Sequence, residues 1–147
     1  MSSQTTALNS GNQAHIKTDV SRIFVGRNRY TKARYNNSAY GSVELLAGTV
    51  MGRVKVTGWI KPHTSGASDG SEYPIGVLAE DITVAGGGLV DLFICTEGDV
   101  VADKLIFTTS TDNIDKTVGD RRVRDWFQVG GIKLITENSE LSAYDNE

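Results

Sequence analysis

Short stretches in which apolar and polar residues alternate recur along the chain, as they do in half-buried β-strands. In GRVKVTGWIKP, residues 52–62, the side chains of Val54, Val56 and Ile60 would share one face of a strand. Pro62 cannot donate a ladder hydrogen bond, so we expect it to end this strand. The period of two therefore predicts one strand over the stretch.

Two further stretches predict a pair of antiparallel strands. PIGVLA, residues 74–79, is apolar at nearly every position, which indicates a strand buried on both faces. LVDLFICT, residues 89–96, alternates again, and the three glycines at 86–88 favour a turn before it. We expect the two strands to pair as a hairpin.

One stretch near the end, GDRRVRDWFQVGG, predicts a short helix. Its apolar positions follow the i, i+3, i+4 spacing of an amphipathic helix, at Val123, Trp126 and Phe127. We expect Asp120 to be its N-cap and Gly130 to be its left-handed stop. GIKLIT, residues 131–136, then predicts a closing strand.

Length and cysteine content limit the possible classes of protein. The 147 residues are enough for one domain with a proper core. The chain has no run of roughly 18 apolar residues and no apolar signal-peptide segment, so we expect it to be made and used without crossing a membrane. Cys95 is the only cysteine, which excludes an intrachain disulfide and a cysteine-rich zinc site.

Charge is distributed unevenly along the chain. Residues 1–35 carry six Lys and Arg against one Asp, a net charge of +5, whereas the other 112 residues carry nine against seventeen, a net charge of −8. The closing segment ENSELSAYDNE, residues 137–147, has only acidic residues among its charges. The chain thus divides into a basic arm and an acidic body.

The turn-forming stretch NNSAYGS, residues 36–42, marks the boundary of this arm. We interpret residues 1–40 as a flexible basic arm and residues 41–147 as a β-rich domain with an acidic C-terminal tail. Residues 1–14 are too polar to bury much surface, and we expect them to be disordered in the free protein. SRIFVGRNRY, residues 21–30, suits a short edge strand. Removal of the arm should leave a folded domain.

The acidic residues around the second predicted strand are candidates for chemistry. Asp69 and Glu72 flank a turn, whereas Glu80 and Asp81 are adjacent on a strand and point to opposite faces. This arrangement does not make a pair of catalytic carboxylates, and we interpret the four residues as solvated turn and strand-end positions. The sequence predicts no enzyme, no metal site and no cofactor.

The remaining chemistry-bearing residues give no stronger signal. His15 and His63, the two histidines, lack a metal-binding spacing. Cys95 lies in a strand-like run and is interpreted as a small buried hydrophobe. Trp59 falls on the polar face of its predicted strand, where it would either anchor an interface or cover a neighbouring strand.

Several motifs occur together in one order. They are AGTVMGRV at 47–54, DGSE at 69–72, PIGVLAED at 74–81 and GDVVADKLIF at 98–107. In this order and spacing, over roughly residues 41–136, they resemble the head decoration (capsid cement) proteins of tailed phages, the lambda-type family.

The resemblance implies a trimer that binds three-fold and quasi-three-fold positions of the expanded head and stabilises it against DNA packaging pressure. It implies that the N-terminal segment orders on the major capsid protein of the same phage, beside a coat strand. Carried over to this chain, the capsid-binding residues are Arg22, Ile23, Phe24, Val25, Arg27, Arg29 and Tyr30. The protein would lie on the outer surface of the virion after assembly in the host cytoplasm, with no cofactor, no membrane and no direct nucleic-acid contact.

Pattern and resemblance together predict a mainly β (α+β) fold. We expect a small β-barrel-like domain of short strands, with one short C-terminal helix and an extended N-terminal arm. Two other functions stay open. The chain could be another virion structural protein, such as a tail or receptor-binding surface component, or a nucleic-acid-binding protein that acts through its basic arm.

Overall fold

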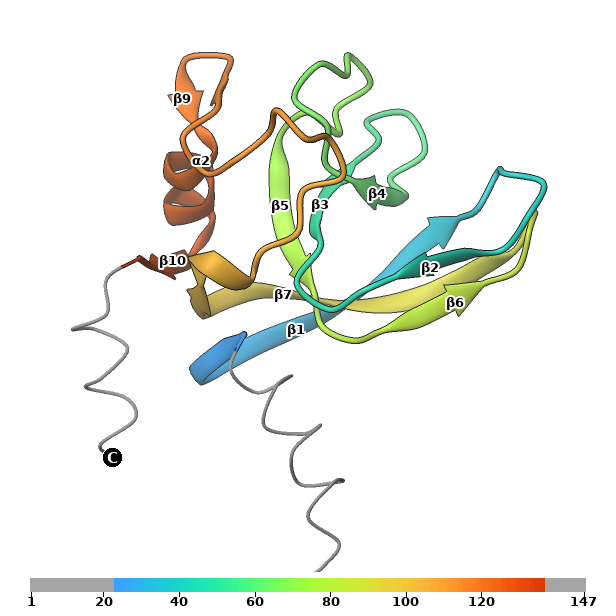
Figure 1. The fold of residues 1–147 in the computed structure, drawn as a ribbon, viewed down its shortest axis with the longest axis horizontal. Helices are drawn as coiled ribbons and strands as arrows, with labels where there is room; N and C mark the ends of the chain where they lie inside the picture. The colour runs from blue at the N-terminus through green and yellow to red at the C-terminus, as the bar shows by residue number, and fades with distance from the viewer. Residues whose placement is uncertain (1–22, 137–147) are drawn as a thin grey trace, which may run out of the picture.

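The structure, a computed structural model, describes residues 23–136 as a closed barrel of five strands with a helix packed beside it (Figure 1). The strands are β1 Phe24–Asn36, β2 Val43–Leu45, β3 Val50–Arg53, β4 Ile60–Pro62, β5 Pro74–Leu78, β6 Ile82–Val84, β7 Leu89–Val101, β8 Thr117–Val118, β9 Arg121–Arg122 and β10 Ile132–Ile135. The helical segments are a 3-10 turn, Ala102–Lys104, and α2, Val123–Gly130. The predicted mainly β, barrel-like fold class is confirmed.

The barrel runs in the order β1, β4, β3, β5 and β7, and β7 pairs back to β1. β1 is antiparallel to β7, with Phe24 opposite Val100, and it pairs with β4 only at Tyr35. β10 adds to the other edge of β7, with Leu134 also opposite Val100. The first and last described strands therefore flank the same end of β7.

β3 and β5 are buried on both faces. Successive side chains of a strand point to opposite sides, so each of these strands contributes to two core clusters. One core cluster, beneath α2, contains Val50, Val77, Cys95 and Phe127, and a second cluster contains Met51, Leu78, Leu92 and Ile94. The prediction that PIGVLA is buried on both faces is therefore confirmed. β5 and β7 pair antiparallel, as expected. β6 lies between them in the sequence, but it pairs with β2 in a separate two-stranded sheet.

The stretch 52–62 is a hairpin, and the prediction of one continuous strand is wrong. The backbone N–H of Val54 donates to the carbonyl of Trp59 over 2.8 Å, which closes the turn between β3 and β4. Gly58 has a φ of 75°, a left-handed conformation that glycine adopts without steric cost. Val56, which the alternation assigns to the buried face, is 92% exposed at the turn.

The helix forms where the sequence predicts it, but both of its ends differ. The N-cap is Arg122, whose side chain makes no cap hydrogen bond. The expected cap, Asp120, is too early in the sequence, because the next two residues form β9. The left-handed residue is Gly131, with a φ of 109°, one position after the expected stop. Two arginines at this end form ion pairs with Asp115, which lies 2.6 Å from Arg124 and 3.7 Å from Arg122.

The boundary between arm and body also differs from the prediction at residue 40. Ala33 and Tyr35 of β1 are each 7% exposed and belong to the second core cluster. The folded body therefore includes the residues from 23 onward, and removal of residues 1–40 would delete a barrel strand. The rest of the predicted arm, residues 1–22, and the acidic tail, residues 137–147, lie outside the described residues.

Candidate functional site

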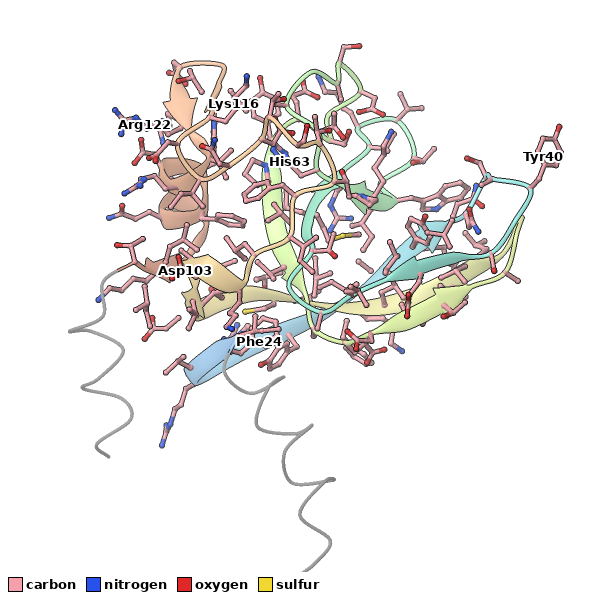
Figure 2. All side chains as sticks on the ribbon, in the orientation of Figure 1. Phe24, Tyr40, His63, Asp103, Lys116 and Arg122 are labelled. Atoms are coloured by element: carbon pink, nitrogen blue, oxygen red, sulfur yellow. The ribbon has the colours of Figure 1, made fainter. Side chains whose placement is uncertain are left out.

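The residues predicted to bind the capsid lie at the start of β1, at the opposite end of the molecule from the loop that carries Tyr40 (Figure 2). Arg22 lies outside the described residues. Ile23 is 8% exposed and packs in the cluster beneath α2, which Phe24 also contacts. Val25 is half-buried. Ile23 and Phe24 therefore help to hold the start of β1 in the barrel.

A β-bulge separates the buried start of β1 from exposed residues. Gly26 has a φ of 75°, and the register with β7 shifts on its C-terminal side. Within the bulge, the Asn28 Nδ2 atom donates to the Asp99 carbonyl over 3.2 Å and lies 3.5 Å from the Sγ of Cys95. Because a bulge re-aims the neighbouring side chains, the residues on either side of Asn28 turn toward solvent.

Arg27, Arg29 and Tyr30 are exposed at the bulge. The Arg29 Nε atom lies 3.4 Å from a carboxylate oxygen of Glu97, and the two side chains are 74% and 53% exposed. Such an ion pair contributes little to stability, so the guanidinium group is available to a partner. Tyr30 is 45% exposed and sets its ring edge-on to that of Phe24. Partial burial raises the pKa of its phenol, which stays protonated at neutral pH.

The exposed basic surface continues along β1 to two residues that the sequence analysis did not select. Lys32 and Arg34 alternate with buried residues and therefore share the outer face. The Lys32 Nζ atom lies 6.0 Å from the ring centroid of Phe93, and Arg34 pairs with Asp91 at 3.3 Å. The alternation in YTKARYN would have indicated this face if the stretch had been treated as a strand. We define the β1 stripe as Arg27, Arg29, Tyr30, Lys32 and Arg34.

One edge of β1 is free of strand partners. Over residues 24–34, β1 pairs only with β7 among the described strands, and its first pairing on the other edge comes at Tyr35. An unpaired edge presents backbone N–H and carbonyl groups to which another strand can add. The charged side chains of the β1 stripe discourage chance pairing at this edge.

Trp59 is not part of this surface. It is half-buried in the turn before β4, where its backbone N–H donates to the Thr57 hydroxyl over 3.2 Å. β4 meets β1 at Tyr35, five residues beyond Tyr30, which along a strand is about 16 Å at about 3.3 Å per residue. The structure therefore separates Trp59 from the predicted capsid-binding residues.

Asp69 and Asp81, two of the four carboxylates considered for chemistry, hold loops in place. The hydroxyl and the backbone N–H of Ser71 donate to Asp69, and Lys61 lies 3.1 Å away; these hydrogen bonds hold the Asp69 pKa well below its usual range. Asp81 accepts the backbone N–H of Ala47 over 2.7 Å. Within residues 23–136, no group of three His, Cys, Asp or Glu side chains is placed to hold a metal ion. No helix in this range is long and apolar enough to cross a membrane.

A barrel with a basic stripe and a free edge strand fits a structural protein that binds another macromolecule through its surface. The comparison with protein families identifies the class more closely. The model of the bacteriophage lambda head decoration protein D family matches residues 22–122, and the chain belongs to this family. It is a phage head decoration protein, a component of the virion capsid, and the family is structural and not known for enzymatic activity.

The limits of the match divide the fold. It begins at residue 22, next to β1, and ends at Arg122, so α2, β10 and the acidic tail lie beyond it. The comparison with individual curated proteins finds no match.

Proposed function

We propose that the chain binds as a homotrimer at three-fold and quasi-three-fold positions of the expanded head of its phage and stabilises the shell against packaged DNA. The proposed partner is the major capsid protein, and the proposed location is the outer surface of the shell. The observation that carries the proposal is the family match over residues 22–122. The β1 stripe and the free edge beside it support a contact with another protein.

The proposed contact face is the end of the barrel at the start of β1. Residues 1–22 are joined to the chain at this end, and Arg27, Arg29 and Tyr30 are the predicted site residues that the fold leaves accessible. The free edge supports the addition of a coat strand beside β1. Ile23 and Phe24 support this face from the core and are not proposed as contacts.

The stabilisation follows from mass action. A ligand that binds the expanded shell and not the unexpanded one stabilises the expanded shell by RT ln(1 + L/Kd) per site, where L is the free ligand concentration. Three linked subunits bind more tightly than one, because the second and third attachments are intramolecular. Each contact of the β1 stripe can then be weak, and screened by salt, and the trimer still binds the shell stably.

The test is co-sedimentation with expanded and unexpanded heads of the source phage. Full-length protein should bind saturably to expanded heads and should not bind to unexpanded heads. A chain lacking residues 1–21 should not bind to either form. The Arg27→Gln, Arg29→Gln double variant should bind expanded heads more weakly than the parent. The matched control, Lys55→Gln with Lys116→Gln, removes two exposed charges elsewhere and should bind normally. Absence of binding to either head form would overturn the proposal, and unchanged binding of the shortened chain would overturn the role of the N-terminal segment.

A further inference from the structure

A half-buried amide side chain lies at the centre of the bulge in β1. The Asn28 Nδ2 atom donates to the Asp99 carbonyl and lies within 3.5 Å of the Sγ of Cys95, and both of these groups belong to β7. The pairing of the two strands is interrupted here, because it stops at Val25 and resumes at Arg29. The side chain of Asn28 therefore joins β1 to β7 where the register between them shifts.

The backbone of β7 has room for this side chain only because residue 98 is glycine. A Cβ atom at Gly98 would lie 2.6 Å from the Cγ of Asn28 and 2.7 Å from its Oδ1, distances at which the atoms would collide. The N–H of Gly98 in turn donates over 3.1 Å to the carbonyl of Gly131, the left-handed residue that ends α2. β7 and the junction of α2 with β10 thus support the site in which the amide lies.

The hydrogen bonds of this amide are incomplete. The Oδ1 atom of Asn28 is buried and has no hydrogen-bond partner among the described residues. A buried acceptor without a donor costs free energy. Natural proteins keep such costs mainly at positions that serve function. The position of Asn28 is therefore explained better by what the side chain orients than by what it adds to stability.

The side chains next to Asn28 are those of the proposed capsid contact. In a regular strand, Arg27 and Arg29 would point to the same side as the buried Ala33, two and three pairs of residues further on. Instead both arginines are exposed, as is Tyr30, and the register with β7 shifts on each side of Arg29. The bulge therefore turns the two arginines outward.

We infer that Asn28 is a positioning residue of the proposed capsid contact. Its amide, held between Gly98 and the Asp99 carbonyl, fixes the shape of the bulge and so the outward direction of the contact side chains on either side of it. Because Gly98 is bonded to Gly131, the junction of α2 with β10, which lies beyond the family match, supports the same face. What the face binds rests on the proposed function, whereas the shape of the bulge is a property of the free protein.

The first test measures the shape of the bulge by NMR of the free full-length protein. The rings of Phe24 and Tyr30 span the bulge, with centroids 5.7 Å apart. Asn28→Ala should weaken the nuclear Overhauser contact between these rings, and Asn36→Ala, which removes an exposed amide from the same strand, should not. An unchanged ring contact in Asn28→Ala would overturn the inference.

A second substitution approaches the same amide from β7. Gly98→Ala should also weaken the ring contact, because its Cβ atom would displace the side chain of Asn28. The double variant should show little more than either single change, since both act on one contact. Fully additive effects of the two substitutions would contradict the coupling of Asn28 to Gly98.

The last test measures affinity for expanded heads at a temperature at which each variant is folded. Asn28→Ala should bind about tenfold more weakly than the parent, a loss that one side-chain hydrogen bond can account for, and Asn36→Ala should bind normally. A purely structural role would lower the midpoint of thermal unfolding and leave this affinity unchanged, which would overturn the inference. Failure of the parent itself to bind heads would instead overturn the proposed function, and the ring contact would still decide whether Asn28 fixes the bulge.

Discussion

At the scale of single residues, a glycine can be replaced without loss of stability only where no other backbone approaches it closely. A Cβ atom at Gly52 would collide with the backbone of Ser71, whereas one at Gly66 would meet open space. We expect Gly52→Ala to lower the free energy of unfolding by about 1–3 kcal/mol, as overpacking does, and Gly66→Ala to change it by about 0.5 kcal/mol or less. Urea unfolding of both variants measures the difference, and equal stabilities would contradict the packing described here.

His63 is the residue from which a pH dependence is expected. It is fully buried beside Phe107, and neither ring nitrogen has a partner in hydrogen-bonding geometry among the described residues. Burial lowers its pKa, and this outweighs the opposing effect of Asp112 and of the nearby backbone of Ser71 and Glu72. The folded protein therefore holds His63 neutral.

The sign of the effect follows from that lowered pKa. Below about pH 6.5, the value for an unfolded chain, the unfolded state binds a proton that the folded state refuses, so stability falls as the pH falls toward the folded pKa. The loss is at most about 1.4 kcal/mol per pH unit. Urea unfolding at pH 7.5, 6.5 and 5.5 measures it. His63→Leu, which retains His15, should lose this slope, and a parent protein with no slope would contradict the assignment.

At the scale of elements, β1 is the strand on which the body depends. It closes the barrel and contributes Ala33 and Tyr35 to the core. A chain lacking residues 1–21 should therefore unfold cooperatively like the parent, and a chain lacking residues 1–40 should be unfolded. Circular dichroism with thermal melting distinguishes the two. A cooperative transition in the shorter chain would mean that the barrel closes without β1.

α2 is expected to be held by one deeply buried side chain. Phe127 is 1% exposed in the cluster beneath the helix, whereas Val129 on the same helix is 65% exposed. Phe127→Ala should lower the free energy of unfolding by about 3–5 kcal/mol, and the matched control Val129→Ala should change it by about 0.5 kcal/mol or less. Similar losses for both variants in urea unfolding would show that α2 packs through another face.

The same elements show what the sequence could predict. β5 was recognisable because it is apolar on both faces, and α2 because its apolar residues repeat at helical spacing. The hairpin at 52–62 was missed because its alternation continues through the turn, and Gly58 alone does not show that the chain reverses.

Residues 21–30 were expected to form a short edge strand, and β1 includes residues 24–30 of that stretch. Its place in the barrel could not be predicted, because its outer face is charged and its partner β7 lies far along the sequence. The resemblance predicted Ile23, Phe24, Arg27, Arg29 and Tyr30 alike as capsid contacts, and that stays a prediction. The structure adds that Arg27, Arg29 and Tyr30 are exposed, whereas Ile23 is buried and Phe24 packs against the core. Lys32 and Arg34 become part of the stripe only once the long strand is known.

At the scale of the whole molecule, the fold gives the protein two distinct ends. β1 begins and β10 finishes on either side of the same end of β7, and the loop that carries the fully exposed Tyr40 lies at the other end (Figure 2). If the start of β1 contacts the coat protein, as proposed, the Tyr40 loop faces away from the shell. The orientation of the bound protein is therefore a consequence of the proposed function.

Electron cryomicroscopy of expanded heads saturated with the full-length protein tests the central claim most directly. We expect density for three copies around each three-fold and quasi-three-fold position, with the start of β1 against the shell and the Tyr40 loop pointing outward. Heads without added density, single copies at other positions, or trimers with the Tyr40 loop against the shell would contradict it.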